Sequence, residues 1–368
     1  MIKEKTVLIR RIGAFTVAAL AALTVAACGS SNNSSSASKS AGSGSAPATA
    51  GGAKTLVGAG STLVAPLVSV WQPTYDTKYG VAITYGAIGS GGGIEQITAR
   101  TVDFGASDAP MTTSQATACK SCLEIPWALA ATDVAYHVQG VPNGLHFTGP
   151  VLADIWMGKI KAWNAPQIKA LNPGVNLPST AIVPVHRTDG SGDTYAFTNY
   201  LSKVSPTFKS TVGNATTVSW PGGLGGKGNS GVGGVLSSTN GAIAYIAIAY
   251  VLENHFDYGL VQNAAGKYPT PGVPSISAAA DSLTSVPSGG TQGISLTDPP
   301  ASAPNAYPIS TFTYVLVPTM TGASVATPLK KFIGWAVTTG QADGPKLDFA
   351  PLPAKVVAAD QADVNLIK

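Results

Sequence analysis

Apolar residues recur along the chain in two periods, one typical of β-strands and one typical of amphipathic α-helices. Short apolar runs predict strands at residues 55–57, 81–85, 133–138, 181–185, 242–245 and 310–317. Apolar positions three and four residues apart predict helices from residue 63, at about 94–99, at 155–160, 163–171 and 329–337, and after residue 194. Because strands and helices alternate, the sequence predicts an α/β fold with mixed sheets. A Gly-rich stretch at residues 220–234 is expected to be a loop.

The helix predicted after residue 194 follows a stretch rich in charged and hydroxyl side chains, residues 186–194 (HRTDGSGDT). This stretch is expected to be a turn leading into the helix, with Ser191 or Asp193 as the N-cap. Free backbone N–H groups, the positive end of the helix dipole and Arg187 together favour an anion-binding site. The alternative is an ordinary Asp-Gly turn in which Arg187 pairs with a neighbouring Asp.

Two earlier segments repeat this design of strand, Gly/Ser turn and helix N-terminus. Residues 55–62 (TLVGAGST) lead to a helix with Pro66 in its first turn, and Pro73 is expected to end or kink that helix. Leu63, Leu67, Val70 and Trp71 are expected on its apolar face. Residues 81–93 end in the turn GSGGG ahead of the next helix. A strand end at residues 103–108 (DFGASD) then places Asp108 just before an Ala-Pro turn.

Length and composition bound the class of protein. A chain of 368 residues suggests two domains of ordinary size, and charged residues make up only 11% of it. The formal net charge is +4, but residues 1–27 contain four basic residues and one acidic residue, so the remainder carries a net charge of +1. A nearly neutral body without a basic run argues against nucleic-acid binding, which needs clustered Lys and Arg side chains.

The first 53 residues predict export and anchoring. Basic residues precede an apolar run that ends in VAACG, so residues 1–27 are expected to be a signal peptide. The end of the run resembles a bacterial lipobox with Cys28 as the lipidated residue, whereas a plain signal peptide with a chance Cys is the alternative. Residues 28–53 are rich in Ser, Gly and Ala and are expected to form a flexible tether. The folded part is therefore expected at the outer face of the cytoplasmic membrane.

The two remaining cysteines form a Cys-x-x-Cys pair, Cys119 and Cys122. In an exported protein a disulfide that closes this small loop is expected. Thioredoxin-like redox chemistry is the alternative, and a zinc site would need two more ligands at suitable spacing.

Other motifs do not indicate an enzyme, a cofactor or a metal. Residues 223–228 (GLGGKG) match G-x-G-x-x-G, but Trp220-Pro221 precedes them in place of an uninterrupted strand. The four His residues show no metal-ligand spacing, and no G-x-S-x-G elbow is present. A Ser-His-Asp triad assembled in space from scattered residues stays open at this point.

Several motifs, in order and at family-like spacing, resemble the PstS family, the phosphate-binding lipoproteins of phosphate-specific ABC transporters. The motifs are residues 58–62 (GAGST), 89–92 (GSGG), 103–108 (DFGASD), 187–192 (RTDGSG) and 225–229 (GGKGN). The resemblance runs from about residue 55 to about residue 348. It implies a type II periplasmic-binding-protein fold with two α/β lobes and the ligand between them. Lobe I would be residues 54–133 plus 311–368, and lobe II residues 134–310.

The resemblance also implies a set of phosphate-binding residues. In the first lobe these are the Thr62 hydroxyl, the Leu63 backbone N–H, the Ser90 hydroxyl and the Asp108 carboxylate. In the second lobe they are Arg187, braced by Asp189, together with the Ser191 hydroxyl, the Gly192 amide and Asp193. Helix N-termini would supply most donors, so that one Arg suffices.

Two of these acids bear on selectivity. Asp108 can accept a proton that phosphate keeps at neutral pH and that sulfate lacks, so it is expected to reject sulfate. Asp193 stands where some family members have Thr. It is expected either to favour the more protonated phosphate, H2PO4−, or to cap the helix and point away.

The predicted function is a monomeric, lipid-anchored receptor that delivers phosphate to an ABC permease. The alternatives are a receptor for another oxyanion, a secreted phosphate-monoester hydrolase, and a phosphate binder that serves sensing or adhesion.

Overall fold

The strands form one large mixed sheet and a separate two-stranded sheet. The computed structural model describes residues 54–286 and 293–368, so the predictions for residues 1–27, Cys28 and residues 28–53 lie outside the described residues. In the large sheet the order is β2-β1-β3-β11-β4-β8-β6-β7, and β9 also pairs with β4. The strands of this sheet are β1 (Thr55–Gly60), β2 (Ala82–Ala87), β3 (Phe104–Ser107), β4 (Cys122–His137), β6 (Val183–Arg187), β7 (Leu224–Gly226), β8 (Ala242–Ala247), β9 (Asp257–Tyr258) and β11 (Ser310–Pro318). The small sheet pairs β5 (His146–Phe147) with β10 (Leu260–Val261).

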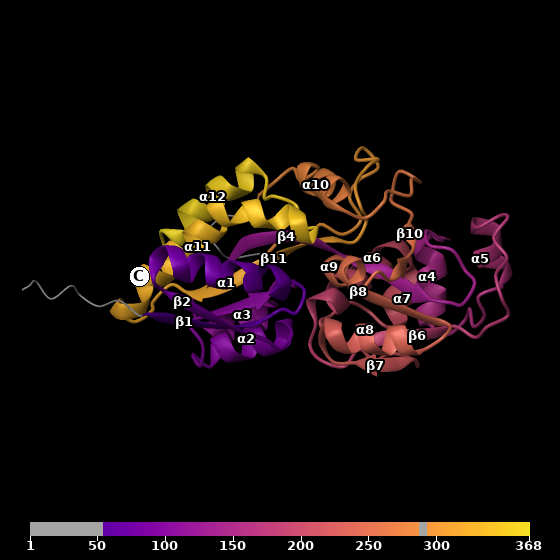
Figure 1. The fold of residues 1–368 in the computed structure, drawn as a ribbon, viewed down its shortest axis with the longest axis horizontal. Helices are drawn as coiled ribbons and strands as arrows, with labels where there is room; N and C mark the ends of the chain where they lie inside the picture. The colour runs from indigo at the N-terminus through magenta and orange to yellow at the C-terminus, as the bar shows by residue number, and fades with distance from the viewer. Residues whose placement is uncertain (1–53, 287–292) are drawn as a thin grey trace, which may run out of the picture. The chain divides into compact units, whose positions relative to one another are not determined.

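Helices connect most of these strands. Those in the first part of the chain are α1 (Ala65–Tyr79), α2 (Ser90–Thr98), α3 (Thr113–Cys119), α4 (Gly149–Trp156), α5 (Pro166–Leu171) and α6 (Gly192–Val204). Those that follow are α7 (Pro206–Thr211), α8 (Gly228–Ser238), α9 (Ile248–Glu253), α10 (Val273–Asp281), α11 (Ala323–Ala336), a 3-10 helix (Thr339–Leu347) and α12 (Ala354–Val364). In Figure 1, α1 and α11 lie on one side of β1 and β2, and α2 and α3 lie on the other.

The pairing in the large sheet is both parallel and antiparallel. Strand β1 is parallel to β2 and β3, and β6 is parallel to β7 and β8. Strand β11 is antiparallel to β3 and β4, and β4 is antiparallel to β8. The prediction of an α/β fold with mixed sheets is therefore confirmed.

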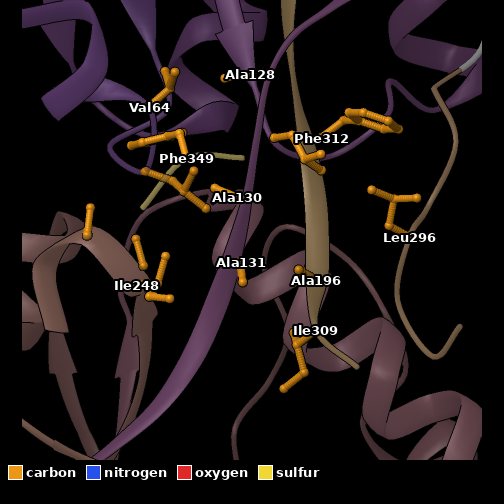
Figure 2. Close-up of a cluster of buried hydrophobic side chains, with 14 of the residues drawn as sticks. Val64, Ala128, Ala130, Ala131, Ala196, Ile248, Leu296, Ile309, Phe312 and Phe349 are labelled. Atoms are coloured by element: carbon orange, nitrogen blue, oxygen red, sulfur yellow. The ribbon is translucent and has the colours of Figure 1, made fainter. Parts of the chain in front are cut away.

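Strand β4 joins the two halves of the large sheet. Its residues up to Ala131 pair with β11, and its residues from Thr132 onward pair with β8. The sequence predicted only residues 133–138 as a strand, but the strand is longer because residues 123–136 are buried throughout. A strand covered on both faces has a nearly continuous apolar run instead of an alternating one. Figure 2 shows Ala128, Ala130 and Ala131 of β4 beside Phe312 of β11.

Three predictions of local structure were wrong. Residues 220–234 are not a loop throughout, since they contain β7 and most of α8. Of the two outcomes expected at Pro73, an end of the helix is wrong, because α1 continues to Tyr79. Val70 does not lie on its buried face, since it is 37% exposed, whereas Leu67, Val68 and Trp71 are buried.

Aromatic side chains fill the core on both sides of β4. Trp71 packs edge-on against Trp127 and Trp335 in the half that contains β1. Trp156 packs edge-on against Phe197 in the half that contains β6. The tryptophans are thus mainly core residues. Among the helices of residues 54–286 and 293–368, none has the length and apolar character needed to cross a membrane.

Candidate functional site

Four helices begin at one place in the structure, each directly after a strand. Helices α1 and α2 follow β1 and β2, and helices α6 and α8 follow β6 and β7. Hydrogen bonds join the four helix starts: Gly91 N donates to Gly190 O at 2.9 Å, Gly192 N to Ser90 Oγ at 3.1 Å, and the Asn229 amide Nδ2 to Thr62 Oγ1 at 2.9 Å. Because each helix N-terminus carries a partial positive charge and free N–H groups, their convergence favours an anion. The fourth helix start, that of α8, is absent from the sequence prediction.

Asp108 lies at the end of β3 and is surrounded by hydroxyl groups. Ser61 Oγ lies 2.6 Å from Asp108 Oδ1 and 2.7 Å from Oδ2, and Thr313 Oγ1 donates to Oδ1 at 2.8 Å. Ser90 Oγ lies 3.3 Å from Oδ2 and also accepts the Asp108 backbone N–H at 3.2 Å. The carboxyl is 1% exposed, and no cation touches it among the described residues.

This environment raises the pKa of Asp108 to about 7. Burial is the main cause, and the negative charge of Asp193 adds to it. Hydrogen bonds from Ser61 and Thr313 and the charge of Arg187 act in the opposite direction. Near neutral pH Asp108 can therefore both hold and release a proton.

Arg187 ends β6 and is paired with two carboxylates. Its Nε donates to Asp189 Oδ1 at 2.8 Å and its Nη2 donates to Asp189 Oδ2, while its Nη1 donates to Asp193 Oδ2 at 2.8 Å. The Arg187 side chain is 1% exposed. Of the five N–H groups of a guanidinium, three are engaged in these bonds, which leaves one on each terminal nitrogen. Burial acts to raise the pKa of Asp189, but the hydrogen bonds and charge of Arg187, together with backbone N–H groups, outweigh it, so this pKa lies below its usual value.

Asp193 faces the site and does not cap α6. The N-cap is Ser191, whose hydroxyl accepts the Thr194 N–H at 3.3 Å. Asp193 accepts hydrogen bonds from Arg187, from Thr132 Oγ1 at 2.8 Å and from Asn229 Nδ2 at 2.9 Å. Burial raises its pKa, against the effect of the Arg187 charge and of these bonds. The predicted alternative, a capping Asp193 that points away, is wrong.

The two hydroxyls just before α1, those of Ser61 and Thr62, bind different partners, Asp108 and Asn229. Ser61 Oγ accepts the Leu63 N–H at 3.0 Å, so this amide points at the same hydroxyl that binds Asp108. Thr62 Oγ1 accepts both the Asn229 N–H at 3.3 Å and the Asn229 amide. The side chains of Ser61, Thr62 and Asn229 are all buried.

Gly192 allows α6 to approach Asp108 closely. A Cβ atom at position 192 would lie 2.4 Å from both Cβ and Oδ2 of Asp108. No side chain fits there without displacing the carboxyl, so the glycine brings the start of α6 to the carboxyl that ends β3.

The sequence did not identify several residues of the site. Ser61 and Asn229 lie inside the motifs at residues 58–62 and 225–229, but the sequence predicts no role for either. Thr132 and Thr313 come from β4 and β11, outside every motif. Tyr245 of β8 accepts the Arg187 N–H at 2.9 Å. The available signal was a polar residue in an otherwise apolar strand, as at Thr132 and Thr313.

The groups in this site suit the binding of an anion and not the catalysis of a reaction. Its donors are hydroxyls, amides and one guanidinium, which suit an oxyanion. Ser61 binds Asp108 directly, whereas a catalytic triad has a His between the two. Within the described residues, no cluster of three or more His, Cys, Asp or Glu could hold a metal ion.

Cys119 and Cys122 lie apart from this site and form a disulfide bond with their Cα atoms 5.6 Å apart. The bond links the end of α3 to the start of β4. Arg100 Nη2 donates to Cys119 O at 2.7 Å beside it.

Comparison with known proteins places the chain in a family. Residues 45–339 match the PBP superfamily domain. The phosphate-binding protein PstS of Xylella fastidiosa (strain Temecula1 / ATCC 700964) is 41% identical over 308 residues, which cover 83% of each chain. PstS of Pasteurella multocida (strain Pm70) is 39% identical over 317 residues, 84% of this chain and 90% of the relative.

The fold agrees with solved structures. The periplasmic phosphate-binding protein PfluDING, solved with bound phosphate, superposes with a TM-score of 0.68 over 85% of this chain and 97% of that one, at 19% identity. The fold and the convergent helix N-termini define a solute-binding protein of the type II periplasmic-binding-protein class. The chain belongs to the PstS family of phosphate-binding proteins.

Proposed function

We propose that this protein is a non-enzymatic receptor that binds inorganic phosphate between the four helix N-termini and delivers it to an ABC import permease. The observation that carries the proposal is the meeting of Thr62, Ser90, Asp108, Arg187 and Gly192 from separate segments at one buried place. With Ser191 and the Leu63 amide, they would provide the donors that a dehydrated tetrahedral anion needs. The Leu63 and Gly192 N–H groups, which donate to Ser61 and Ser90 in this structure, would turn to the ligand when it binds.

The charges of the site favour a protonated phosphate. One cation, Arg187, lies among three carboxyl groups, those of Asp108, Asp189 and Asp193. A fully ionised site would therefore repel a divalent anion. Protons shared between phosphate and the acids relieve this repulsion, and Asp193 thereby favours H2PO4− over HPO4 2−. The second pKa of phosphate lies at roughly 6 to 7, by analogy with phosphoesters, so both forms exist near neutral pH.

Asp108 supplies the selectivity. A phosphate proton can bridge to its carboxylate, whereas sulfate has none to give and would leave two anions facing each other in a dry site. Such unpaired buried charges cost on the order of several kcal/mol.

The two halves of the sheet suggest how the ligand enters. In this proposal residues 54–133 plus 311–368 form one lobe and residues 134–310 the other, with β4 and β11 as the connecting strands. The lobes open and close around the ligand. Lipidation at Cys28 and a tether of residues 28–53 would keep a monomeric receptor near its permease outside the cytoplasmic membrane.

Isothermal titration calorimetry of the full-length protein in detergent tests this function. We expect saturable binding of one phosphate and no binding of sulfate at the same concentration. Equal binding of both anions would indicate a receptor for oxyanions in general. Release of nitrophenol from a phosphate ester by the pure protein would instead support a hydrolase.

A further inference from the structure

We infer that Asn229 is a positioning residue that aims the Thr62 hydroxyl at bound phosphate and couples it to Asp193. The inference rests on the proposed phosphate site and adds a residue from α8, which the implied binding set does not include. Asn229 is 1% exposed and lies in the first turn of its helix.

The orientation of the Asn229 amide is fixed from behind. The backbone N–H of Ala247, at the end of β8, donates to Asn229 Oδ1 at 2.9 Å. Only the carbonyl oxygen of the amide can accept this bond, so the Nδ2 group must point the other way, into the site. Its two hydrogens meet two acceptors, Thr62 Oγ1 and Asp193 Oδ2, each at 2.9 Å. The side chain is thus fully hydrogen-bonded in one orientation.

The bonds from Asn229 determine where the Thr62 hydroxyl proton points. A hydroxyl has two acceptor positions and one donor hydrogen. Both acceptor positions of Thr62 are filled by Asn229, one by its backbone N–H at 3.3 Å and one by its amide. The Thr62 proton must therefore be given elsewhere, and the site offers a bound anion as its acceptor. Without the Asn229 amide only the weaker backbone bond at 3.3 Å remains, so the hydroxyl could rotate and would lose this preorganisation.

The Asn229 amide also links the Thr62 hydroxyl to the ion pair of Arg187 and Asp193. Asp193 Oδ2 accepts from both Arg187 Nη1 and Asn229 Nδ2. Thr62 follows β1, whereas Asn229 and Asp193 follow β7 and β6. One side chain therefore links the two halves of the site, and it forms this link where phosphate is proposed to bind.

Asn229→Ala tests the inference, with Asn172→Ala as the matched control. Asn172 is also a buried asparagine with every amide bond made, to His146 and Ile168. Both variants should lower the melting temperature. We expect Asn229→Ala to weaken phosphate binding roughly 10- to 100-fold, as for a lost buried hydrogen-bond donor, and Asn172→Ala to leave affinity within about twofold of wild type.

A double-mutant cycle separates positioning from general destabilisation. Thr62→Val removes the hydroxyl, and we expect it to weaken binding about 10-fold in the wild type but less than about 3-fold in Asn229→Ala, because the hydroxyl is no longer aimed. Additive losses, or wild-type affinity in Asn229→Ala, would overturn the inference while the wild type still binds phosphate. Absence of phosphate binding by the wild type would instead refute the proposed function.

Discussion

Asp108 and Asp193 are both buried acids of the same site, but they lie in opposite surroundings. Asp108 is solvated by the hydroxyls of Ser61, Ser90 and Thr313. Asp193 is paired with the guanidinium of Arg187 at 2.8 Å and accepts two further hydrogen bonds. Burial raises the pKa of both acids, and that of Asp108 reaches about 7.

The difference assigns the two acids different tasks. A carboxyl surrounded by hydroxyls can change its protonation state near pH 7 without breaking an ion pair, so Asp108 is suited to exchange a proton with the ligand. Asp193 would have to give up its bond with a buried cation to do the same. It acts mainly through its charge, which sets the charge balance of the site.

The largest effect should come from removing the cation. Arg187→Gln leaves the buried Asp193 and the partly buried Asp189 without their partner and removes the two N–H groups left for the ligand. We expect phosphate affinity to fall at least about 1000-fold and the protein to lose roughly 3–5 kcal/mol of stability, measured by calorimetry and urea unfolding. Arg187→Lys should retain part of the stability but little of the affinity, because an ammonium cannot form the same fork.

Arg100→Gln is the matched control for this variant. It also removes a guanidinium that hydrogen-bonds to protein atoms, but Arg100 is exposed and lies beside the disulfide. Phosphate binding should stay at the wild-type level. An equal loss of affinity in both variants would mean that overall charge, and not the placement of Arg187, attracts the anion.

Replacing Asp108, which is surrounded by hydroxyls, should change selectivity more than stability. In Asp108→Asn the amide keeps the size of the side chain but can donate a hydrogen bond to an oxyanion. We expect phosphate affinity to fall roughly 10- to 100-fold and sulfate to bind measurably in competition calorimetry. Unchanged rejection of sulfate would show that Asp108 is not the selectivity filter.

Replacing Asp193, which is paired with Arg187, should change the pH dependence of phosphate affinity. In the wild type we expect phosphate affinity to fall about 10-fold from pH 6 to pH 8, as H2PO4− loses a proton and Asp108, with its pKa of about 7, ionises. Asp193→Asn removes one negative charge, so the site tolerates HPO4 2− and the fall should shrink to less than about 3-fold. A steeper fall would place Asp193 outside the charge balance of the site.

The sequence predicted the parts of the site that local motifs determine. Gly and Ser within a few residues of each other, joined by Asp at Ser191, specify the turns that contain Thr62, Ser90 and Ser191. Thr132, Thr313 and Asn229 escaped prediction because each reaches the site from a segment distant in sequence. Their roles depend on which strands are neighbours, and the pairing of β4 with β11 and β8 decides that.

The prediction of a loop for the Gly-rich segment at residues 220–234 was wrong for a physical reason. Glycine disfavours helices, so residues 220–234 resembled a loop. Tertiary contact overrides this propensity: a Cβ at position 226 would lie 2.5 Å from the backbone nitrogen of Val232, so glycine lets β7 and α8 pack backbone to backbone. The same close contact brings Asn229 to Thr62. A prediction from propensity alone therefore missed the helix and its role together.

A third buried acid extends the comparison, because it has neither hydroxyls nor a cation. Asp360 of α12 is 0% exposed, and both of its carboxyl oxygens have no hydrogen-bond partner in the described part of the chain. Burial raises its pKa from 3.8 to about 9, and the charge of Asp363 contributes. Asp360 should therefore be neutral at pH 7 in the folded protein.

Asp360→Asn tests this difference and should have the smallest effect on phosphate binding, since Asp360 lies in α12, outside the site. The folded-state pKa exceeds the unfolded value, so the contribution of Asp360 to stability is most favourable below about pH 4 and becomes less favourable as the pH rises toward about 9. Asparagine has no proton to lose. We expect the variant to gain on the order of several kcal/mol relative to wild type in urea unfolding at pH 8 and nothing at pH 4. Asp76→Asn on the exposed face of α1 is the control and should change neither value. An equal gain at both pH values would point to packing instead of ionisation. It would also weaken the argument that partners, more than burial, decide which buried acids of this protein carry charge.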